Sequence, residues 1–432
     1  MRRLEGAWLM LKKIMVEHEI LEARCWDGLP STCSKVVFAG EFLWRDIVAI
    51  EAFAIPDAGP AIEDLRDRLK RTRWPEDVRS PAGEHGVDAD FLKDLCAYWR
   101  DGFDWSAQVR RFAKFGHFRW TGGGGGVHFI HVRGKGPDTI PLILTHGWPG
   151  SFVEMLEIIP LLTVPEAHGG DAKDAFDVVV PSLPGFGFSD RPREDGVNTF
   201  RIAELWKDMM RELGYERFVA QGGDIGAGVS TILGLRHPDH MLGVHLNYIP
   251  GSYRPYLREG VEISPEEAAF RESVGRWVDE HGAYWHLQAT TPLTAAYGLN
   301  DSPAGLAAWI VEKFAKWADC DGDVYRRFTR DELLANVTLY WLTGTIYSSF
   351  RLYYEGRRAP LHFGPEDFVR VPCGIAAFPK EAPAPPRSWV ERGYNVQRWT
   401  EMPSGGHFAA MEEPELLAAD IRAFSRRFRG RG

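Results

Sequence analysis

Residues 217–231 read RFVAQGGDIGAGVST, an apolar strand-like run followed directly by small residues that can begin a helix. Gly222 and Gly226 flank Asp224 in the pattern small-x-nucleophile-x-small, which is typical of a nucleophile elbow. The flanking positions of such a turn must be nearly free of side chains, because the chain bends sharply and projects the central residue above a sheet. Alternatively, Asp224 only caps the following helix. The stretch therefore predicts a strand, a tight turn and a helix, with Asp224 as the candidate nucleophile.

Short apolar runs alternate with amphipathic segments after residue 141, as in a mostly parallel sheet covered on both faces. We predict strands at 142–146, 176–181, 217–222, 243–248, 374–379 and 396–402. Residues 250–335 break this rhythm with helical, aromatic-rich segments. We interpret them as a helical cap over the carboxyl ends of the strands, where open α/β sheets place their sites.

The chain before residue 136 has a different pattern. Residues 48–74 predict an extended start and an amphipathic helix that packs as an arm, and residues 89–111 predict two helical pieces broken at Gly102. Two aromatic strands flank Gly122–Gly126 and predict a hairpin. These glycines do not predict a phosphate loop, because no helix or lysine follows them in the required context.

These patterns predict an α/β fold in five segments. They are an N-terminal extension (1–47), an arm with helices and the first hairpin (48–135), the first part of the core (136–249), the helical cap (250–335), and the cap return with the second part of the core (336–432).

Composition excludes several classes of function. The 432 residues are 44% hydrophobic and 26% charged, as in globular proteins, and the net charge of −9 comes from interspersed acids and bases. We therefore expect no nucleic-acid partner. The five cysteines are widely spaced and indicate neither disulfides nor zinc, which favours the cytoplasm. Charges interrupt the apolar residues 6–23, so no membrane partner is expected. The sequence leaves the oligomeric state open, with a homodimer as one candidate.

A second motif lies after an earlier predicted strand, where residues 145–151 read THGWPGS. In enzymes with a nucleophile elbow, one backbone N–H of an oxyanion hole comes from such a loop and the other from the residue after the nucleophile. The two candidate donors are Trp148 and Ile225. We interpret His146 as a structural histidine that pairs with loop backbone. Residues 181–190 form another turn, which either shapes the rim of the site or only packs.

A general base is available at His407, in the sequence Gly405-Gly406-His407-Phe408 after the last predicted strand. The chain order nucleophile, acid, histidine requires a carboxylate between Asp224 and His407. Glu381 follows a predicted strand and is the candidate acid, although it could be a solvated loop charge. Glu401, within the last strand, is the weaker rival.

The chain resembles the microsomal-type epoxide hydrolase family, a branch of the α/β hydrolases with an N-terminal arm. The resemblance covers roughly residues 48–428, and its matching blocks are AIEDLRDRLKRTRWP (61–75), LTHGWPGSFVEM (144–155), PSLPGFGFSD (181–190), QGGDIGA (221–227), LNDSPAGLAAWIVEKF (299–314), YWLTGTIYSSFRLYYE (340–355) and GGHFAAMEEPELLAADI (405–421). Two features depart from the family: Ile225 stands where a tryptophan is usual, and we expect the membrane anchor that is common in the family to be absent.

The resemblance implies hydration of a small apolar epoxide to a vicinal diol through an ester on Asp224, with water as co-substrate and no metal or organic cofactor. It also implies that Tyr284 (in AYWHLQ) and Tyr353 (in FRLYYE) hold the epoxide oxygen. A phenol suits this task because it stays protonated at neutral pH. Either tyrosine could instead be buried packing.

Two other functions remain open. A haloalkane dehalogenase would use the same aspartate but needs halide-binding side-chain N–H groups, a role that Trp148 could serve. A catalytically silent ligand-binding protein is the alternative from another class, which the combination of Asp224, Glu381 and His407 disfavours. Four cap aromatics are compatible with a bulky apolar substrate or with core packing: Trp277, Trp285, Trp309 and Phe350.

Overall fold

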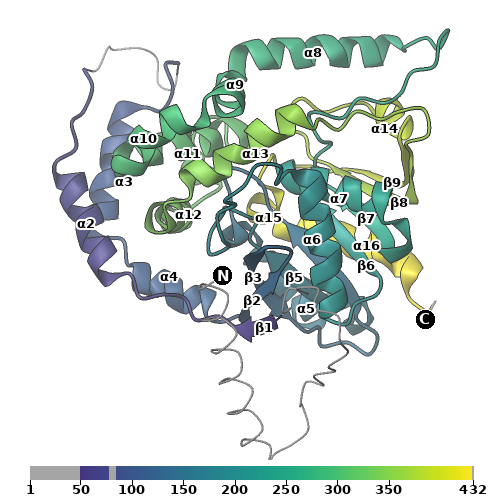
Figure 1. Ribbon diagram of the computed structural model, residues 1–432, viewed down its shortest axis with the longest axis horizontal. Coiled ribbons are helices and arrows are strands. Elements are labelled where there is room, and N and C mark those ends of the chain that lie inside the picture. Colours follow the sequence, from purple (N-terminus) through teal and green to yellow (C-terminus); the bar gives the residue numbers. More distant parts are fainter. Residues whose placement is uncertain (1–48, 77–83, 431–432) are drawn as a thin grey trace, which may run out of the picture. The chain divides into compact units, whose positions relative to one another are not determined.

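The computed structural model describes residues 49–76 and 84–430 (Figure 1). Their strands form one nine-stranded sheet in the order β1-β2-β3-β5-β4-β6-β7-β8-β9. The strands are β1 Ala49–Ala52, β2 His117–Gly122, β3 Gly125–Val132, β4 Ile140–Thr145, β5 Phe176–Pro181, β6 Phe218–Gly222, β7 Met241–Leu246, β8 Val369–Ala377 and β9 Tyr394–Glu401. Pairing is antiparallel from β1 to β5 and parallel from β5 to β9. This is the sheet of an α/β hydrolase, as the sequence predicts.

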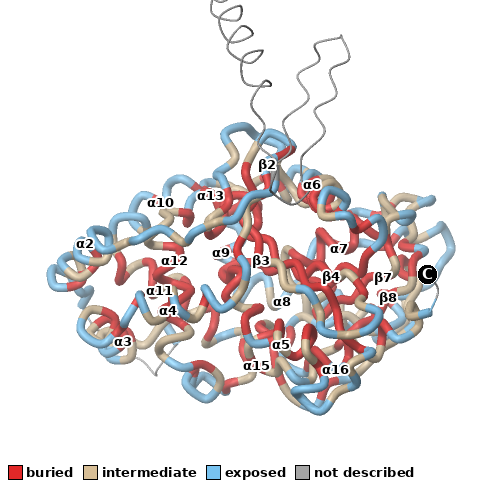
Figure 2. The backbone as a smooth tube through the Cα atoms, turned by 90° about the horizontal axis from the view of Figure 1, so that it is seen from below, coloured by how far each residue is buried: buried red, intermediate tan, exposed pale blue. Residues whose placement is uncertain are grey.

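Helices pack on both faces of the sheet. Two helices, α6 (Thr199–Glu212) and α7 (Asp224–Arg236), pack together on one face, and α5 (Ile158–Thr163) packs with α16 (Pro414–Ser425) on the other. The central strands β4 to β7 and helix α7 are mostly buried (Figure 2). Burial on all sides explains why α7 lacks a polar stripe, since both of its faces contact protein.

The six core strands predicted from the sequence are all present, with one clear difference in bounds. Strand β8 begins at Val369 and not at residue 374. The sequence missed its first half because buried and more exposed residues alternate there and Pro372 interrupts them, so a continuous apolar run identifies only the second half. The register against β9 also shifts in this first half, as expected near a proline in a strand.

Helices between β7 and β8 form the cap: α8 Pro265–His281, α9 Ala283–Thr290, α10 Pro292–Asp301, α11 Pro303–Trp317, α12 Arg330–Thr343 and α13 Ile346–Arg358. Helices α9 and α13 pack against each other, as do α10 and α13. The helical region thus continues past residue 335 to Arg358. The division of the chain into five segments remains a proposal about domain organisation.

The N-terminal helices pack against the cap. They are α2 Gly59–Lys70, α3 Ala89–Asp101 and α4 Trp105–Phe112, of which α2 and α3 contact α11, and α4 contacts α12. Trp99 Nε1 donates to Thr338 Oγ1 at 2.8 Å inside this contact. The Tyr98 hydroxyl donates to Asp331 at 2.8 Å at its edge. The arm therefore supports the helices that cover the site.

Residues 1–47, including the apolar stretch 6–23 and the predicted extension, lie outside the described residues. Among the helices of 49–76 and 84–430, none has the length and apolarity needed to cross a membrane.

Candidate active site

The elbow at Asp224 has the close backbone contacts that its glycines predict. Asp224 has a φ of 44°, a left-handed conformation that costs a residue with a side chain on the order of 1–3 kcal/mol. A Cβ on Gly226 would lie 1.9 Å from the Thr145 oxygen, and one on Gly222 would lie 2.2 Å from the Gly226 carbonyl carbon. Side chains cannot be accommodated at either position, so the strained turn depends on both glycines.

Two backbone N–H groups point at the Asp224 carboxylate. The Trp148 N–H donates to Oδ1 at 2.8 Å, and the Ile225 N–H also bonds to this carboxylate. Burial raises the pKa of Asp224, while His407 and the two N–H groups oppose the rise. Both candidate oxyanion donors therefore lie where a charge on Asp224 or on a tetrahedral centre would develop.

The loop that carries Trp148 is fixed by helix α12. Asn336 Nδ2 donates to the Pro149 oxygen and the Tyr340 hydroxyl donates to the Gly150 oxygen, each at 2.8 Å. Ser151 Oγ donates to Asn336 Oδ1 at 2.8 Å. These buried bonds hold the Trp148 N–H in place from the cap side.

His407 lies between two carboxylates. Its Nδ1 is 3.0 Å from each oxygen of Glu381, and its Nε2 is 3.7 Å from Asp224 Oδ2. Burial lowers the pKa of His407, but Glu381, Asp224 and Glu154 outweigh it and raise this pKa to about 9. The rival acid Glu401 is exposed at the end of β9. The arrangement brings together the candidate nucleophile, base and acid.

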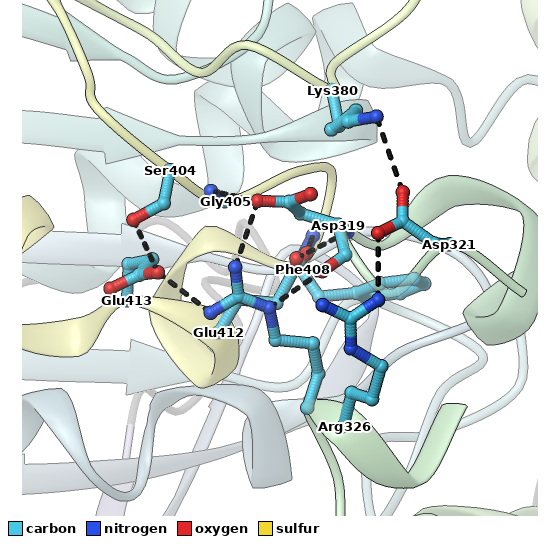
Figure 3. Close-up of polar contacts among 10 residues, drawn as sticks. Asp319, Asp321, Arg326, Lys380, Ser404, Gly405, Phe408, Glu412 and Glu413 are labelled. Atoms are coloured by element: carbon cyan, nitrogen blue, oxygen red, sulfur yellow. Dashed lines mark hydrogen bonds and ion pairs between the residues drawn. The ribbon is translucent and has the colours of Figure 1, made fainter. Parts of the chain in front are cut away.

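Polar contacts hold the loop before His407 (Figure 3). Asp319 Oδ2 accepts the Gly405 N–H at 2.9 Å and pairs with Arg327 at 2.8 Å. Arg327 also pairs with Glu413 at 2.7 Å, and Glu413 accepts from Ser404 Oγ at 2.6 Å.

The backbone around His407 has further ties to the cap. Glu412 accepts the N–H groups of Phe408 and Asp319 at 2.9 and 2.7 Å (Figure 3). The His407 N–H itself donates to the Trp317 oxygen at 3.0 Å, and the two rings meet edge to face. The position of the base thus depends on the turn between α11 and α12.

His146 has the structural role that the sequence predicts. The Leu183 N–H donates to its Nε2 at 3.2 Å, so Nδ1 carries the proton and donates to the Gly147 oxygen at 3.0 Å. Burial lowers the pKa of His146 to about 4. The neutral ring thus connects the Trp148 loop to the loop 181–190. The Ser348 hydroxyl of α13 donates to the Gly185 oxygen of this second loop, so the loop supports the helix that carries Tyr353.

Tyr284 of α9 and Tyr353 of α13 meet near Asp224. Their rings are 5.9 Å apart at 80°, and both contact the Trp148 ring. Burial and the charge of Asp224 raise both pKa values well above that of an ordinary phenol. The buried Tyr353 hydroxyl has no hydrogen bond of normal geometry among the described residues, although it lies close enough to Tyr284 to lower the pKa of that phenol. Both groups therefore stay protonated at neutral pH.

A cavity of about 120 Å³ opens from Asp224 and His407 toward the cap. We name it the cap cavity; its lining includes Tyr248, Trp277, Tyr284 and Trp317. Of the four cap aromatics singled out in the sequence, Trp277 lines this cavity. Trp285 is exposed, and Phe350 is buried against Trp148. Composition alone did not distinguish these three positions.

Three further residues near the site were not predicted from the sequence. Tyr248 and Trp317 line the cap cavity, and each packs edge to face on the His407 ring. Glu154 lies near Asp224 and His407 on the other side of the nucleophile. Its signal was available, because it is the single acid in the apolar block LTHGWPGSFVEM. Within the described ranges, no cluster of three or more His, Cys, Asp or Glu side chains could hold a metal ion.

Comparison with known proteins places the chain in a class. Residues 140–280 match the family described as alpha/beta hydrolase fold, and residues 50–155 match the family described as Epoxide hydrolase N terminus. A "Putative epoxide hydrolase" of Stigmatella aurantiaca is 43% identical over 88% of this chain and 86% of its own length. "Epoxide hydrolase 1" of Oryctolagus cuniculus is 38% identical over 87% of this chain and 88% of its own length.

Two solved structures are similar over almost the same region. The juvenile hormone epoxide hydrolase of the silkworm Bombyx mori has a TM-score of 0.79 at 30% identity, covering 89% of this chain and 96% of that one. The Aspergillus niger epoxide hydrolase has a TM-score of 0.75 at 28% identity, covering 90% of this chain and 98% of that one. The fold and the motifs define an α/β hydrolase with a cap and an N-terminal arm. More specifically, the chain belongs to the epoxide hydrolase family.

Proposed function

We propose that this protein is an epoxide hydrolase that converts epoxides to vicinal diols through a covalent ester on Asp224. The single observation that carries the proposal is the meeting of Asp224 with two protonated phenols on one side and the His407–Glu381 pair on the other. A nucleophile, an acid for the opening oxygen and a base for water are the groups that this reaction needs.

In the first step, an oxygen of Asp224 forms a bond to an epoxide carbon in the cap cavity, and the C–O bond of the ring breaks. The opening oxygen takes a proton from the phenol pair of Tyr284 and Tyr353. Their raised pKa values mean that the proton is present at neutral pH and available for transfer. The product of this step is a hydroxyalkyl ester of Asp224.

In the second step, His407 takes a proton from water, whose oxygen bonds to the Asp224 carbonyl carbon. The N–H groups of Trp148 and Ile225 stabilise the oxyanion. Collapse of this tetrahedral intermediate breaks the bond between the Asp224 carbonyl carbon and the substrate oxygen, and the substrate oxygen takes the proton from His407. The new carboxyl group of Asp224 then releases its proton, which restores the phenol pair.

Esterification explains how a histidine with a pKa of about 9 can act as a base. The negative charge of Asp224 is one of the causes that raise this pKa. An ester carries no charge, so this contribution disappears when the intermediate forms and the pKa of His407 falls. The imidazolium then gives its proton to solvent, so neutral His407 is available to take a proton from water, and His407 takes a proton back from solvent once Asp224 regains its charge.

The rival reaction, dehalogenation of a haloalkane, has one feature in its favour. The Trp148 Nε1 is buried without a hydrogen-bond partner among the described residues, so it could bind a halide. Its expected second donor is missing, because Ile225 has no side-chain N–H. The phenol pair has no role in halide release, whereas epoxide opening requires its proton. A silent binding protein has no need of the strained Asp224 backbone.

Substrate, location and assembly are also proposals. We infer a small apolar epoxide, since four aromatic side chains line the cap cavity, and the charged lining residues include the catalytic candidates Asp224, Glu381 and His407. A cytoplasmic location is supported by Cys96, Cys320 and Cys373, which are buried and unpaired. The homodimer remains a prediction, which sedimentation of the purified protein can check.

Activity on two substrates tests the function. The purified protein should convert styrene oxide to its diol and should release no chloride from 1-chlorobutane. Changing both Tyr284 and Tyr353 to phenylalanine should nearly abolish diol formation. Chloride release that survives this double change would show a dehalogenase, and inactivity on both substrates with retained ligand binding would show a binding protein.

A further inference from the structure

A second, smaller cavity touches Asp224 and His407 from the side of the core. It offers about 20 Å³, enough for the centre of about one water molecule, and its lining includes Glu154, Asn247 and Ala410. We name it the core cavity. The cap cavity also touches Asp224 and His407, so the nucleophile and base lie between a larger space lined by aromatic and charged side chains and a space of water size.

Glu154 contributes a carboxyl group to the core cavity. It lies in the 3₁₀ turn Phe152–Met155, and its Oε1 occupies the space beside Gly150, where a Cβ would lie 1.1 Å away. The pKa of Glu154 is raised to about 8, chiefly by desolvation and also by the charge of Asp224, whereas His407 and the Ser151 N–H oppose the rise. The side chain is half-buried by its exposed area.

Its charge state follows from its neighbours. The core cavity is lined by the Asp224 carboxylate and by His407, whose ring lies between Asp224 and Glu381. A further negative charge in this desolvated space beside Asp224 would be costly, which favours a neutral Glu154 at pH 7. A neutral carboxyl group has a carbonyl oxygen that accepts a hydrogen bond and a hydroxyl that donates one.

We propose that Glu154 is a positioning residue for ester hydrolysis, which holds the hydrolytic water in the core cavity between itself, His407 and the Asp224 carbonyl carbon. The proposal rests on the ester mechanism proposed above. One water proton goes to His407 Nε2, and the other is held by the Glu154 carbonyl oxygen. The water lone pair then faces the carbonyl carbon, and the new C–O bond forms as His407 takes its proton. Substrate enters from the cap side, so the ester does not block this water.

The test separates the two chemical steps, with styrene oxide as the substrate in single-turnover experiments. Glu154→Leu removes the acceptor, so ester hydrolysis should slow at least about tenfold while ester formation stays within about threefold of the wild type. Mass spectrometry of the peptide that contains Asp224 should then show accumulated ester. Glu154→Gln keeps a neutral carbonyl oxygen and should hydrolyse the ester within about threefold of the wild type.

Two further variants control for structural damage. Val153→Ala weakens packing in the same turn at a buried side chain and should leave the ratio of the two rates unchanged. Ala410→Val fills the core cavity from helix α15 (Ala409–Glu412) and should accumulate ester as Glu154→Leu does. The second variant keeps the proposal testable if Glu154→Leu does not fold.

Several outcomes would overturn the proposal. Equal slowing of both steps in Glu154→Leu would assign Glu154 a purely structural role, and normal ester hydrolysis would remove it from the reaction. Glu154→Gln as slow as Glu154→Leu would exclude a neutral acceptor. The absence of any Asp224 ester, even in His407→Gln, would overturn the ester mechanism together with this proposal. The four results are distinct, so the two proposals can fail separately.

Discussion

His407 Nε2 lies 3.7 Å from Asp224 Oδ2, close enough for an ion pair and too far for a normal hydrogen bond. On the other side of the same ring, Nδ1 is 3.0 Å from each carboxylate oxygen of Glu381. The imidazolium form is therefore favoured in the free enzyme by two carboxylates, one of which loses its charge during the proposed reaction. This relationship links the pKa of His407 to the chemical state of Asp224.

Replacement of Asp224 by asparagine should lower the pKa of His407 from about 9. The amide has nearly the shape of the carboxylate but carries no charge, so it imitates the uncharged ester. Titration of the His407 ring by NMR measures the change. An unchanged pKa would mean that the charge of Asp224 does not contribute to it, and that ester formation does not release the base.

The same raised pKa makes stability depend on pH. His407 titrates near 6.5 in the unfolded chain and near 9 in the folded one, so its contribution is complete below pH 6.5 and is lost as the pH rises through 9. Denaturant unfolding of the wild type and His407→Gln should give a difference in unfolding free energy that falls by about 3 kcal/mol over this range. Buried histidines such as His146 titrate in both proteins, so their effects cancel. A difference that rises with pH would contradict a raised pKa.

Tyr353→Phe should slow ester formation by about 100-fold or more and leave ester hydrolysis nearly unchanged. The proton of this phenol is needed only when the epoxide ring opens. Rapid-quench measurement of each step provides the comparison. Tyr354→Phe is the control at the neighbouring position, because the Tyr354 ring packs under the Arg358 guanidinium and has no proposed part in ring opening. If both steps slow equally in Tyr353→Phe, this tyrosine supports the packing around Trp148 instead.

The sequence was sufficient for the features that depend on local pattern. The glycines around Asp224 predict an elbow because no side chain fits there, and the alternation of apolar runs and helices predicts the parallel sheet. The roles of Glu381 and His407 followed from chain order, and the tyrosines from resemblance to a family. Their places in the structure are consistent with these interpretations, and the assignment of roles still awaits experiment.

Features set by long-range packing could not be predicted in this way. Glu154 is distinguished by desolvation and by its distance from His407, which belongs to a different segment of the chain. Trp285 of α9 and Trp277 of α8 lie on neighbouring helices, yet the first is exposed and the second lines the cap cavity. Such differences depend on how the cap helices pack, and this packing cannot be predicted from periodicity in the sequence.

Arg327→Met should destabilise the protein by roughly 1–3 kcal/mol and should also reduce activity, because Arg327 joins Asp319 and Glu413 next to the His407 loop. The matched control is Arg326→Met. Arg326 pairs with Asp321 at an exposed position, so its loss should cost about 0–1 kcal/mol and leave activity intact (Figure 3). Unfolding curves and steady-state rates check both variants. Equal effects of the two changes would mean that the network does not hold the His407 loop.

The origin of the product oxygen tests the nucleophile directly. If Asp224 attacks the epoxide, the new hydroxyl of the diol comes from its carboxylate and not from water. In heavy-oxygen water, with enzyme in excess over styrene oxide so that each molecule turns over once, the first diol should carry ordinary oxygen.

The label should instead enter Asp224, because hydrolysis at the carbonyl carbon leaves one solvent oxygen on the carboxylate and later turnovers pass it into product. His407→Gln should accumulate the ester, since water loses its base while the nucleophile remains. Mass spectrometry of the diol and of the peptide containing Asp224 measures both. Label in the first diol and none in this peptide would mean that His407 activates water against the epoxide itself. The carboxylate of Asp224, between the phenols and the imidazole, would then act only through its charge.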